Sequence, residues 1–172
     1  MNKKFLLFIV SVIVLLFGVS IFVRAQKLFT PQKTHYHAGF VVFQNDKKLD
    51  FSDMKYMSVE PCVLNNKRDN DTPEQIQIEK AHLHDNVGNL VHVERTGPIW
   101  KDLFTNIHYP IDFTKTTGYI NGKQVNNYQF QSIKPFDSLV VFIGKSDQKL
   151  LAQAVTKGYM IKMAKKSTTC GD

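Results

Sequence analysis

The stretch "IQIEKAHLHDNVGNLVHVE", residues 76–94, decides both the fold and the candidate site. Residues 76–84 and 90–94 alternate apolar and polar side chains, which is typical of half-buried strands. Between them, "DNVGN" at 85–89 has the composition of a turn. We therefore expect a β-hairpin, in which directly opposed residues share a face. Its register pairs His84 with Leu90, His82 with His92, and Lys80 with Glu94.

Five of the six histidines lie in two short segments of the chain. Because alternate residues of a strand share a face, the hairpin gathers His82, His84 and His92 on one side, together with Glu94. The segment "HYHAG", 35–39, adds two more histidines with the same spacing. If a strand over 35–43 lies next to the hairpin, all five imidazoles converge. A register slip of one residue would send His92 to the opposite face and break the cluster.

Converging imidazoles are typical of a transition-metal site, since their nitrogens bind zinc at about 2.0–2.1 Å and also suit copper, nickel and iron. The ion we expect is copper or zinc. The candidate metal ligands are His35, His37, His82, His84, His92 and Glu94. The alternative is a polar sheet face whose histidines hold no ion.

Several neighbours of the cluster have more than one interpretation. Glu94 could be a ligand, could orient a histidine, or could pair across the strands with Lys80. Asp85 is expected to cap the turn through its own backbone. His108 is expected in a loop, away from the cluster. The thioethers at 54 and 57 could bind Cu(I), although methionines at such spacing are commonly core filler.

The N-terminus carries an uncharged run of 19 residues, "FLLFIVSVIVLLFGVSIFV" at 5–23, preceded by two lysines. A membrane-spanning helix needs about 20 apolar residues, whereas a secretory signal has a core of about 7–15. We predict a single-pass anchor in the cell membrane, with the C-terminal domain outside the cytoplasm. Cleavage after Ala25 is the alternative. Both cysteines, Cys62 and Cys170, lie in the part expected outside the cytoplasm. In an oxidising compartment they either form a disulfide or remain two thiols.

The net charge of +7 does not indicate nucleic-acid binding. The excess lies in three basic residues near the N-terminus and in six lysines from residue 145 onward, whereas residues 26–144 carry 13 basic and 13 acidic side chains. A nucleic-acid-binding domain would concentrate positive charge on its folded surface. We therefore exclude nucleic acid as a partner, and no protein partner is indicated.

Other elements follow from local patterns. We expect a hairpin over 35–51, a helix over 98–107, a hairpin over 117–125 that turns at Asn121-Gly122, a buried strand over 137–144 and a helix over 146–157. This order predicts an α+β domain with helices on one face of a mostly antiparallel sheet, which a β-grasp-like arrangement fits. The expected divisions are 1–25 as cytoplasmic tip and transmembrane helix, 26–34 as stalk, 35–144 as the histidine-rich domain and 145–172 as C-terminal helix and basic tail.

Three motifs resemble an uncharacterised family of small exported or membrane-anchored bacterial and archaeal proteins. They are "HYHA" at 35–38, "HLHDNVGNLVHVE" at 82–94 and "IWKDLF" at 99–104. The family has an HxHA strand and an LHxHDxxGxxHVE segment. The resemblance implies a shared folding unit over about residues 35–144 and a shared site, but it names no reaction.

Three classes of function remain compatible with these observations. The first, which we favour, is a membrane-anchored extracytoplasmic domain that binds copper or zinc as a sensor, buffer or delivery protein. The second is a metal-dependent hydrolase or lyase with Asp85 or Glu94 as general base. The third is a metal-free interaction module of the cell envelope.

Overall fold

The computed structural model describes residues 2–29, 31–58 and 72–166, so both cysteines lie outside the described residues. The chain divides into two units, Met1–Gln32 and Lys33–Asp172. In the first unit, helix α1 (Lys3–Phe29) contains the whole apolar run, and residues 26–29, expected in a stalk, are helical. Within the described residues we find no helix that is both long enough and apolar enough to cross a membrane.

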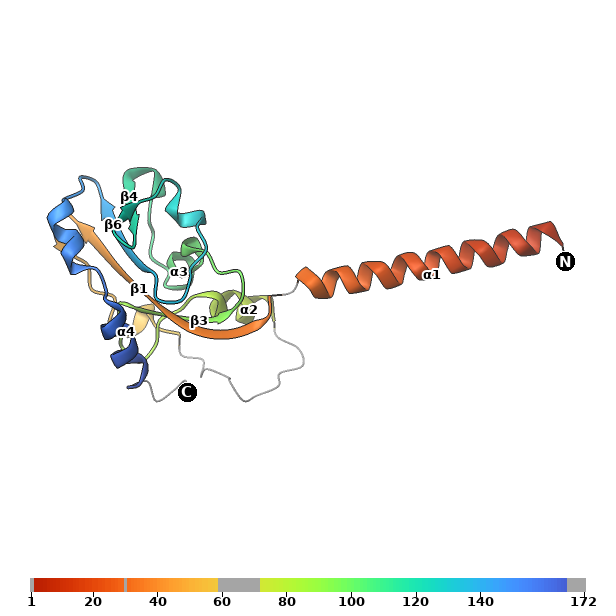
Figure 1. The fold of residues 1–172 in the computed structure, drawn as a ribbon, viewed down its shortest axis with the longest axis horizontal. Coiled ribbons are helices and arrows are strands. Elements are labelled where there is room, and N and C mark those ends of the chain that lie inside the picture. The colour runs from red at the N-terminus through yellow and green to blue at the C-terminus, as the bar shows by residue number, and fades with distance from the viewer. Residues whose placement is uncertain (1, 30, 59–71, 167–172) are drawn as a thin grey trace. The chain divides into compact units, whose positions relative to one another are not determined.

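The second unit is built on a mixed sheet of six strands (Figure 1). The strands are β1 (Lys33–Gln44), β2 (Lys47–Lys48), β3 (Leu90–Arg95), β4 (Thr116–Ile120), β5 (Lys123–Gln124) and β6 (Ser138–Ile143). Their order is β2-β1-β6-β4-β5, and β3 also pairs with β1. The pair β1–β6 is parallel and the others are antiparallel. The α+β class is therefore confirmed, with a mixed sheet.

Two hairpins form where turn chemistry predicted them. Asn45 and Asp46 join β1 to β2, and Asn121 and Gly122 join β4 to β5. All four residues have positive φ angles, between 51° and 77°, as a two-residue type I′ turn requires. The returning strand of the first hairpin is Lys47–Lys48 rather than residues 49–51.

The predicted strand over 76–84 is wrong, because most of it belongs to helix α2 (Pro73–Lys80). The helix starts with a capping box, in which the Thr72 hydroxyl accepts from the amide of Gln75 and the Gln75 side chain accepts from the amide of Thr72. Such a box satisfies two of the unpaired amides at a helix start. After α2, His82 forms an isolated antiparallel bridge with His92.

The other helices match the sequence prediction unevenly. Helix α3 (Trp100–Asn106) confirms the helix expected over 98–107 and buries its apolar side chains. The helix expected over 146–157 is wrong. That segment holds a 3-10 helix, η4 (Gln148–Gln153), and helix α4 (Lys157–Ala164) begins later, where the Thr156 hydroxyl accepts from the amide of Tyr159. Further single 3-10 turns are η1 (Met54–Tyr56), η2 (Phe113–Lys115) and η3 (Tyr128–Phe130).

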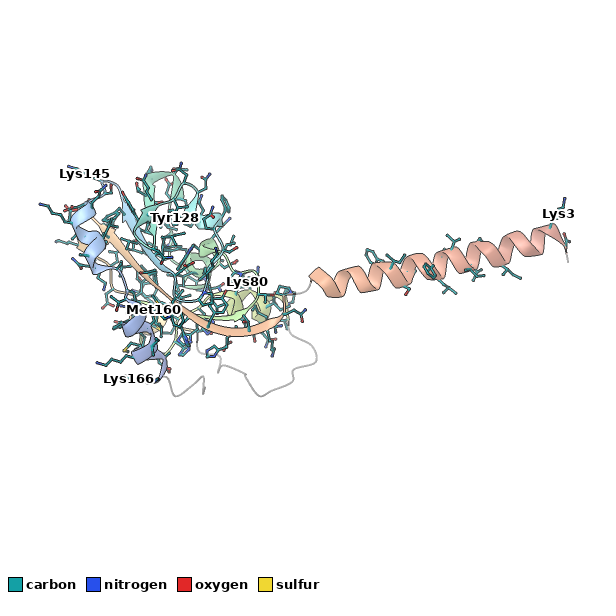
Figure 2. All side chains as sticks on the ribbon, viewed as in Figure 1. Lys3, Lys80, Tyr128, Lys145, Met160 and Lys166 are labelled. Atoms are coloured by element: carbon teal, nitrogen blue, oxygen red, sulfur yellow. The ribbon has the colours of Figure 1, made fainter. Side chains whose placement is uncertain are left out.

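Both faces of the sheet are covered, which corrects the expectation that helices occupy one face. Even-numbered residues of β1, such as Phe40, pack in a core with α3 and with Tyr128 of η3. Odd-numbered residues, such as Val41, pack against Met160 of α4 (Met160 and Tyr128 are labelled in Figure 2). Because strand residues alternate between faces, the histidines at 35 and 37 lie on the α4 side of the sheet.

Candidate histidine site

The sheet places three histidines in one row across three neighbouring backbone segments. His37 of β1 lies opposite His92 of β3, and His82 lies opposite His92 on its other side. The amides and carbonyls of His82 and His92 exchange hydrogen bonds of 3.0 and 2.9 Å. Both the His82–His92 register and the expected adjacency of the 35–43 strand are confirmed.

The five imidazoles of the two segments form one cluster with His92 at its centre. The His92 ring centroid lies 4.3 Å from that of His37 and 3.5 Å from that of His84. The ring centroids of His35 and His37 lie 4.8 Å apart, and those of His82 and His84 lie 5.6 Å apart. Residues more than forty positions apart in the sequence thus converge on one patch of the sheet.

Three of these side chains have the geometry of a ligand set. One ring nitrogen from each of His35, His37 and His92 lies within 4.8 Å of the other two. Two nitrogens bound to one tetrahedral ion lie about 3.4 Å apart, given bonds of about 2.0–2.1 Å. Small side-chain rotations therefore suffice to bring the three nitrogens onto a shared ion.

Two nitrogens of this triad have unsatisfied hydrogen-bonding capacity. His35 Nε2 and His92 Nδ1 are buried and have no hydrogen-bond partner among the described residues. A buried polar atom without a partner costs about 1–3 kcal/mol. A metal ion between the rings would satisfy these atoms, so the donor set fits a transition metal.

The rings of His82 and His84 are each oriented by a hydrogen bond from Nδ1 to an oxygen acceptor. His82 Nδ1 donates to the carbonyl of Ile78 at 3.1 Å, and His84 Nδ1 donates to the carboxylate of Asp85 at 2.8 Å. Each ring then carries its lone pair on Nε2. Metal-binding histidines are commonly fixed in this way by a carbonyl or carboxylate. Asp85, expected only to cap its turn, thus orients His84.

Burial keeps the inner histidines uncharged. It lowers the pKa of His82 to about 3, with a further contribution from His84. Burial also lowers the pKa of His84 and that of His92. Neutral imidazole is the form that binds metals. These three rings are therefore in the form that binds metals at neutral pH.

Glu94 lies near the cluster but outside the triad. Its side chain is 8% exposed, and burial together with the charge of Glu79 raises its pKa to about 7. Its carboxylate does not join the group of mutually close ligand atoms found within the described part of the chain. The expected strand pairing of Glu94 with Lys80 is wrong, because Lys80 ends α2 and its Nζ lies 3.7 Å from Asp102.

Asn106 is a supporting residue that the sequence did not reveal. Its side-chain amide donates to the carbonyls of Gln77 at 2.8 Å and Ala81 at 2.7 Å, and contacts that of Ile78 at 3.3 Å. The Ile78 carbonyl is also the acceptor for His82. These partners lie 25 to 29 residues away in the chain, so no local pattern indicated the contact.

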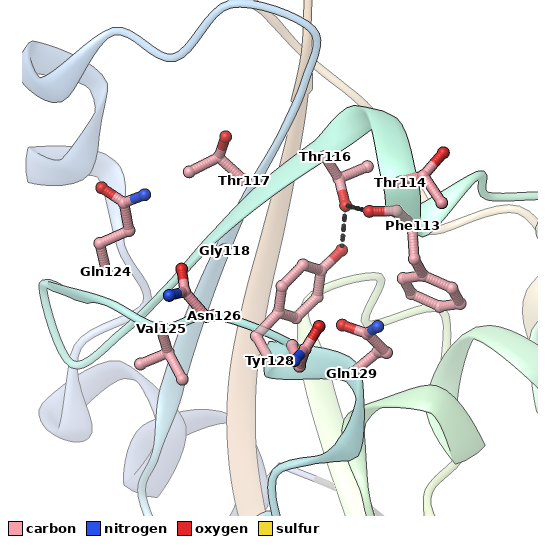
Figure 3. Close-up of a pocket in the computed structure, with 11 residues that line it drawn as sticks. Phe113, Thr114, Thr116, Thr117, Gly118, Gln124, Val125, Asn126, Tyr128 and Gln129 are labelled. Atoms are coloured by element: carbon pink, nitrogen blue, oxygen red, sulfur yellow. Dashed lines mark hydrogen bonds between the residues drawn. The ribbon is translucent and has the colours of Figure 1, made fainter.

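Among the clefts of this unit, one borders the histidine cluster and another lies away from it. An apolar cleft of about 630 Å³ is lined by His82 and by the exposed His108. A polar cleft of about 440 Å³ lies along β4 and η3, and uncharged side chains line it (Figure 3). Within it, the hydroxyls of Tyr128 and Thr116 are 3.0 Å apart. Burial raises the pKa of Tyr128 to about 12, so this phenol stays neutral.

The two methionines considered as soft donors differ in their burial. Met54 is exposed, whereas Met57 packs against the core beside α3. Packing of that kind is the common role of methionine. A part for either thioether in binding Cu(I) stays a prediction.

Comparison with known protein families, curated proteins and solved structures finds no match to this chain. The resemblance of residues 35–144 to an uncharacterised family stays a prediction. The fold and the geometry of the histidines are therefore the basis on which a function can be inferred.

Proposed function

We propose that the second unit is a transition-metal-binding domain, with His35, His37 and His92 as ligands and copper or zinc as the ion. The observation that carries this proposal is the convergence of three ring nitrogens from β1 and β3 within 4.8 Å. The two unpartnered buried nitrogens in the same rings support it. All-imidazole ligation suits both ions.

The exposure of the triad favours reversible loading, as a sensor, buffer or delivery protein requires. His35 is partly exposed, whereas His92 is buried. An ion can therefore enter from the β1 side of the cluster. Three ligands leave the fourth position of a tetrahedral ion to water or to a ligand from a partner.

The same open position supports a second candidate, a zinc-dependent hydrolase. Zinc with three protein ligands lowers the pKa of its bound water to about 7 and so generates a nucleophile. Hydrolysis of an activated ester that needs added zinc and is lost in His92→Ala would favour this candidate. Zinc binding without such turnover favours the binding protein.

Two finer features of the chain belong to the same proposal. The order β2-β1-β6-β4-β5, with a parallel central pair, supports a β-grasp-like arrangement. The uncharged run at 5–23 supports a membrane anchor with the metal-binding unit outside the cytoplasm. To test the anchor, membranes containing the full chain are washed with alkaline carbonate, and we expect the chain to stay in the membrane pellet. Release into the wash would contradict the anchor.

Thermal unfolding tests metal binding. The chelator-treated full chain should gain stability with Zn(II) or Cu(II), because a ligand that binds only the folded state stabilises it by mass action. At a hundredfold excess over Kd the gain is about 2.7 kcal/mol, or about 5–10 °C in Tm. His37→Ala and His92→Ala should abolish the shift. His108→Ala, a matched exposed histidine, should keep it. No shift with either ion, or an equal shift in His92→Ala, would overturn the proposal.

A further inference from the structure

The polar cleft along β4 and η3 lies away from the histidine cluster, because β6 separates β4 from β1 in the sheet. Its volume of about 440 Å³ is within the range of about 300–1,000 Å³ that is typical of pockets for small ligands. We propose that this cleft binds a neutral saccharide, and that it does so independently of any metal ion. Its uncharged wall, its side-chain amides and its fixed aromatic ring support this class of ligand.

The wall of the cleft carries no charge within the described part of the chain (Figure 3). Asp112 and Lys115 lie close by in the sequence, but they pair with each other at 3.1 Å and do not line the cleft. A ligand with a phosphate, carboxylate or ammonium group would lose hydration here without gaining an opposite charge. The cleft therefore suits a ligand whose polar groups are all uncharged.

Four side-chain amides contribute hydrogen-bonding groups to the wall, from Gln124, Asn126, Asn127 and Gln129. Among the described residues, the amides of Asn126, Asn127 and Gln129 have no hydrogen-bond partner. Each amide carries two donor hydrogens and one acceptor oxygen. It can therefore donate to one hydroxyl of a sugar ring and accept from the hydroxyl on the next carbon.

The ring of Tyr128 gives the cleft a fixed back wall. This ring packs directly on Gly118 of β4, where a Cβ would collide with it. The Tyr128 side chain belongs to the core, and its ring meets that of Phe113 edge to face, with centroids 6.0 Å apart. Figure 3 shows the Tyr128 ring with Asn126 to one side and Phe113 to the other. A wall that is already ordered lowers the entropy lost on binding, and the exposed part of the Phe113 ring offers an apolar surface to the C–H groups of a sugar.

The backbone of β4 along the cleft already has partners, which favours a saccharide over a peptide. A peptide that adds a strand to a sheet uses unpaired backbone amides and carbonyls at the sheet edge. Here the carbonyl of Gly118 accepts from the amide of Val125 at 2.9 Å, and the amide of Thr116 donates to the carbonyl of Phe113. The cleft therefore presents mainly side-chain amides and hydroxyls to its ligand.

Saturation-transfer NMR tests the proposal on the full chain, in a detergent that has no sugar headgroup. The probes are glucose, galactose, N-acetylglucosamine, maltotriose, cellotriose and chitotriose, each at millimolar concentration, with glucose 6-phosphate as the charged comparison. We expect transfer to at least one neutral probe and weaker transfer to glucose 6-phosphate. No transfer to any neutral probe would overturn the proposal. Stronger transfer to glucose 6-phosphate that needs Asn126 would overturn the assignment to an uncharged ligand.

Variants of the amides test whether the sugar binds in this cleft. Asn126→Ala and Gln129→Ala should each weaken binding of the probe by about 2- to 10-fold, as expected for the loss of one hydrogen bond. Their Tm should match that of the wild type, because neither amide has a partner among the described residues. Gln153→Ala, which removes an exposed amide outside the cleft, should bind like the wild type. Unchanged binding by the Asn126→Ala/Gln129→Ala protein would contradict the assignment.

The sugar and metal proposals fail separately. Chelator should leave saturation transfer to the sugar unchanged, and the Asn126→Ala/Gln129→Ala protein should keep the metal-dependent Tm shift. Sugar binding that is lost with chelator would contradict the independence of the cleft from the histidine cluster.

Discussion

At the scale of one residue, the burial of His82 makes the stability of the metal-free protein depend on pH. The ring is almost fully buried, and burial holds its pKa at about 3 in the folded chain, against about 6.5 in an unfolded chain. As the pH falls below about 6.5, the unfolded chain takes up a proton at this ring and the folded chain does not. Stability of the metal-free protein must therefore fall, because the unfolded state binds more protons.

Urea unfolding of the chelator-treated protein at pH 7, 6 and 5 measures this effect. We expect a loss approaching about 1.4 kcal/mol for each pH unit from this histidine. His82→Gln should make the dependence less steep by the share of one histidine, since glutamine does not titrate whereas the buried His84 and His92 still do, and His108→Gln should follow the wild type. An unchanged slope in His82→Gln would contradict the neutral burial of this ring.

Gly39 of β1 leaves room for Val155 and Met160, which belong to the core on the α4 face of the sheet. A Cβ at this position would collide with the Cβ of Val155 and would lie 2.9 Å from the Cε of Met160. Overpacking of this kind costs about 1–3 kcal/mol, so we expect Gly39→Ala to lower the free energy of unfolding by that amount. Gly158→Ala, in the open part of α4, should leave it unchanged or slightly raised. Equal stability of the two variants in chemical denaturation would show that the contact is not tight.

At the scale of elements, the side chain of Asn106 joins α3 to α2, in addition to the contact between Lys80 and Asp102. Asn106 of α3 donates to carbonyls at the C-terminal end of α2, including one 2.7 Å bond to Ala81. Asn106→Ala leaves part-buried carbonyls without that donor, at about 1–3 kcal/mol. Hydrogen exchange should quicken in residues 76–82, and metal affinity should weaken because the His82 acceptor is no longer fixed. Thr105→Ala, exposed on the same helix, is the control. Unchanged hydrogen exchange in Asn106→Ala would show that this side chain does not hold the C-terminal end of α2 in place.

The elements that could be predicted are those with a local cause. The hairpins at Asn45-Asp46 and Asn121-Gly122 depend on turn residues that accept positive φ, which the sequence displays directly. The helix over 73–80 was missed because Ile76 and Ile78 alternate like strand residues over a short span. The signal that could have found it was the Thr72–Gln75 capping box.

The candidate site was predictable for a different reason. The pairing of His82 with His92 depends on the turn at 85–89, not on the structure before residue 82, so an error about α2 did not change it. The alternation along β1 placed His35 and His37 on a common face. The support from Ile78 and Asn106 was not predictable, because it depends on packing between α2 and α3.

At the scale of the whole molecule, the second unit contains everything that the proposed site needs. Its two cores pack on opposite faces of the sheet, and the triad comes from β1 and β3. We expect a fragment of residues 33–172 to unfold in one cooperative step and to bind zinc with the affinity of the full chain. Loss of binding in this fragment, measured by calorimetry, would mean that the first unit contributes to the site.

The topology of the unit lay beyond local patterns. The parallel pairing of β1 with β6 joins residues almost a hundred positions apart, and no turn signal specifies it. The position of α4 on the second face depends on the close approach that Gly39 allows. The sequence therefore indicated an α+β unit, whereas the placement of helices on both faces required the structure.

X-ray absorption at the zinc edge tests the central proposal most directly, because it reports the atoms bound to the ion in the zinc-loaded chain. We expect a shell of nitrogen atoms at about 2.0–2.1 Å, with the outer-shell scattering of at least three imidazoles. His92→Ala should lose that signal and His108→Ala should keep it. A spectrum of zinc bound only by oxygen atoms, with no imidazole scattering in the wild type, would contradict the assignment of the histidine triad as a metal site.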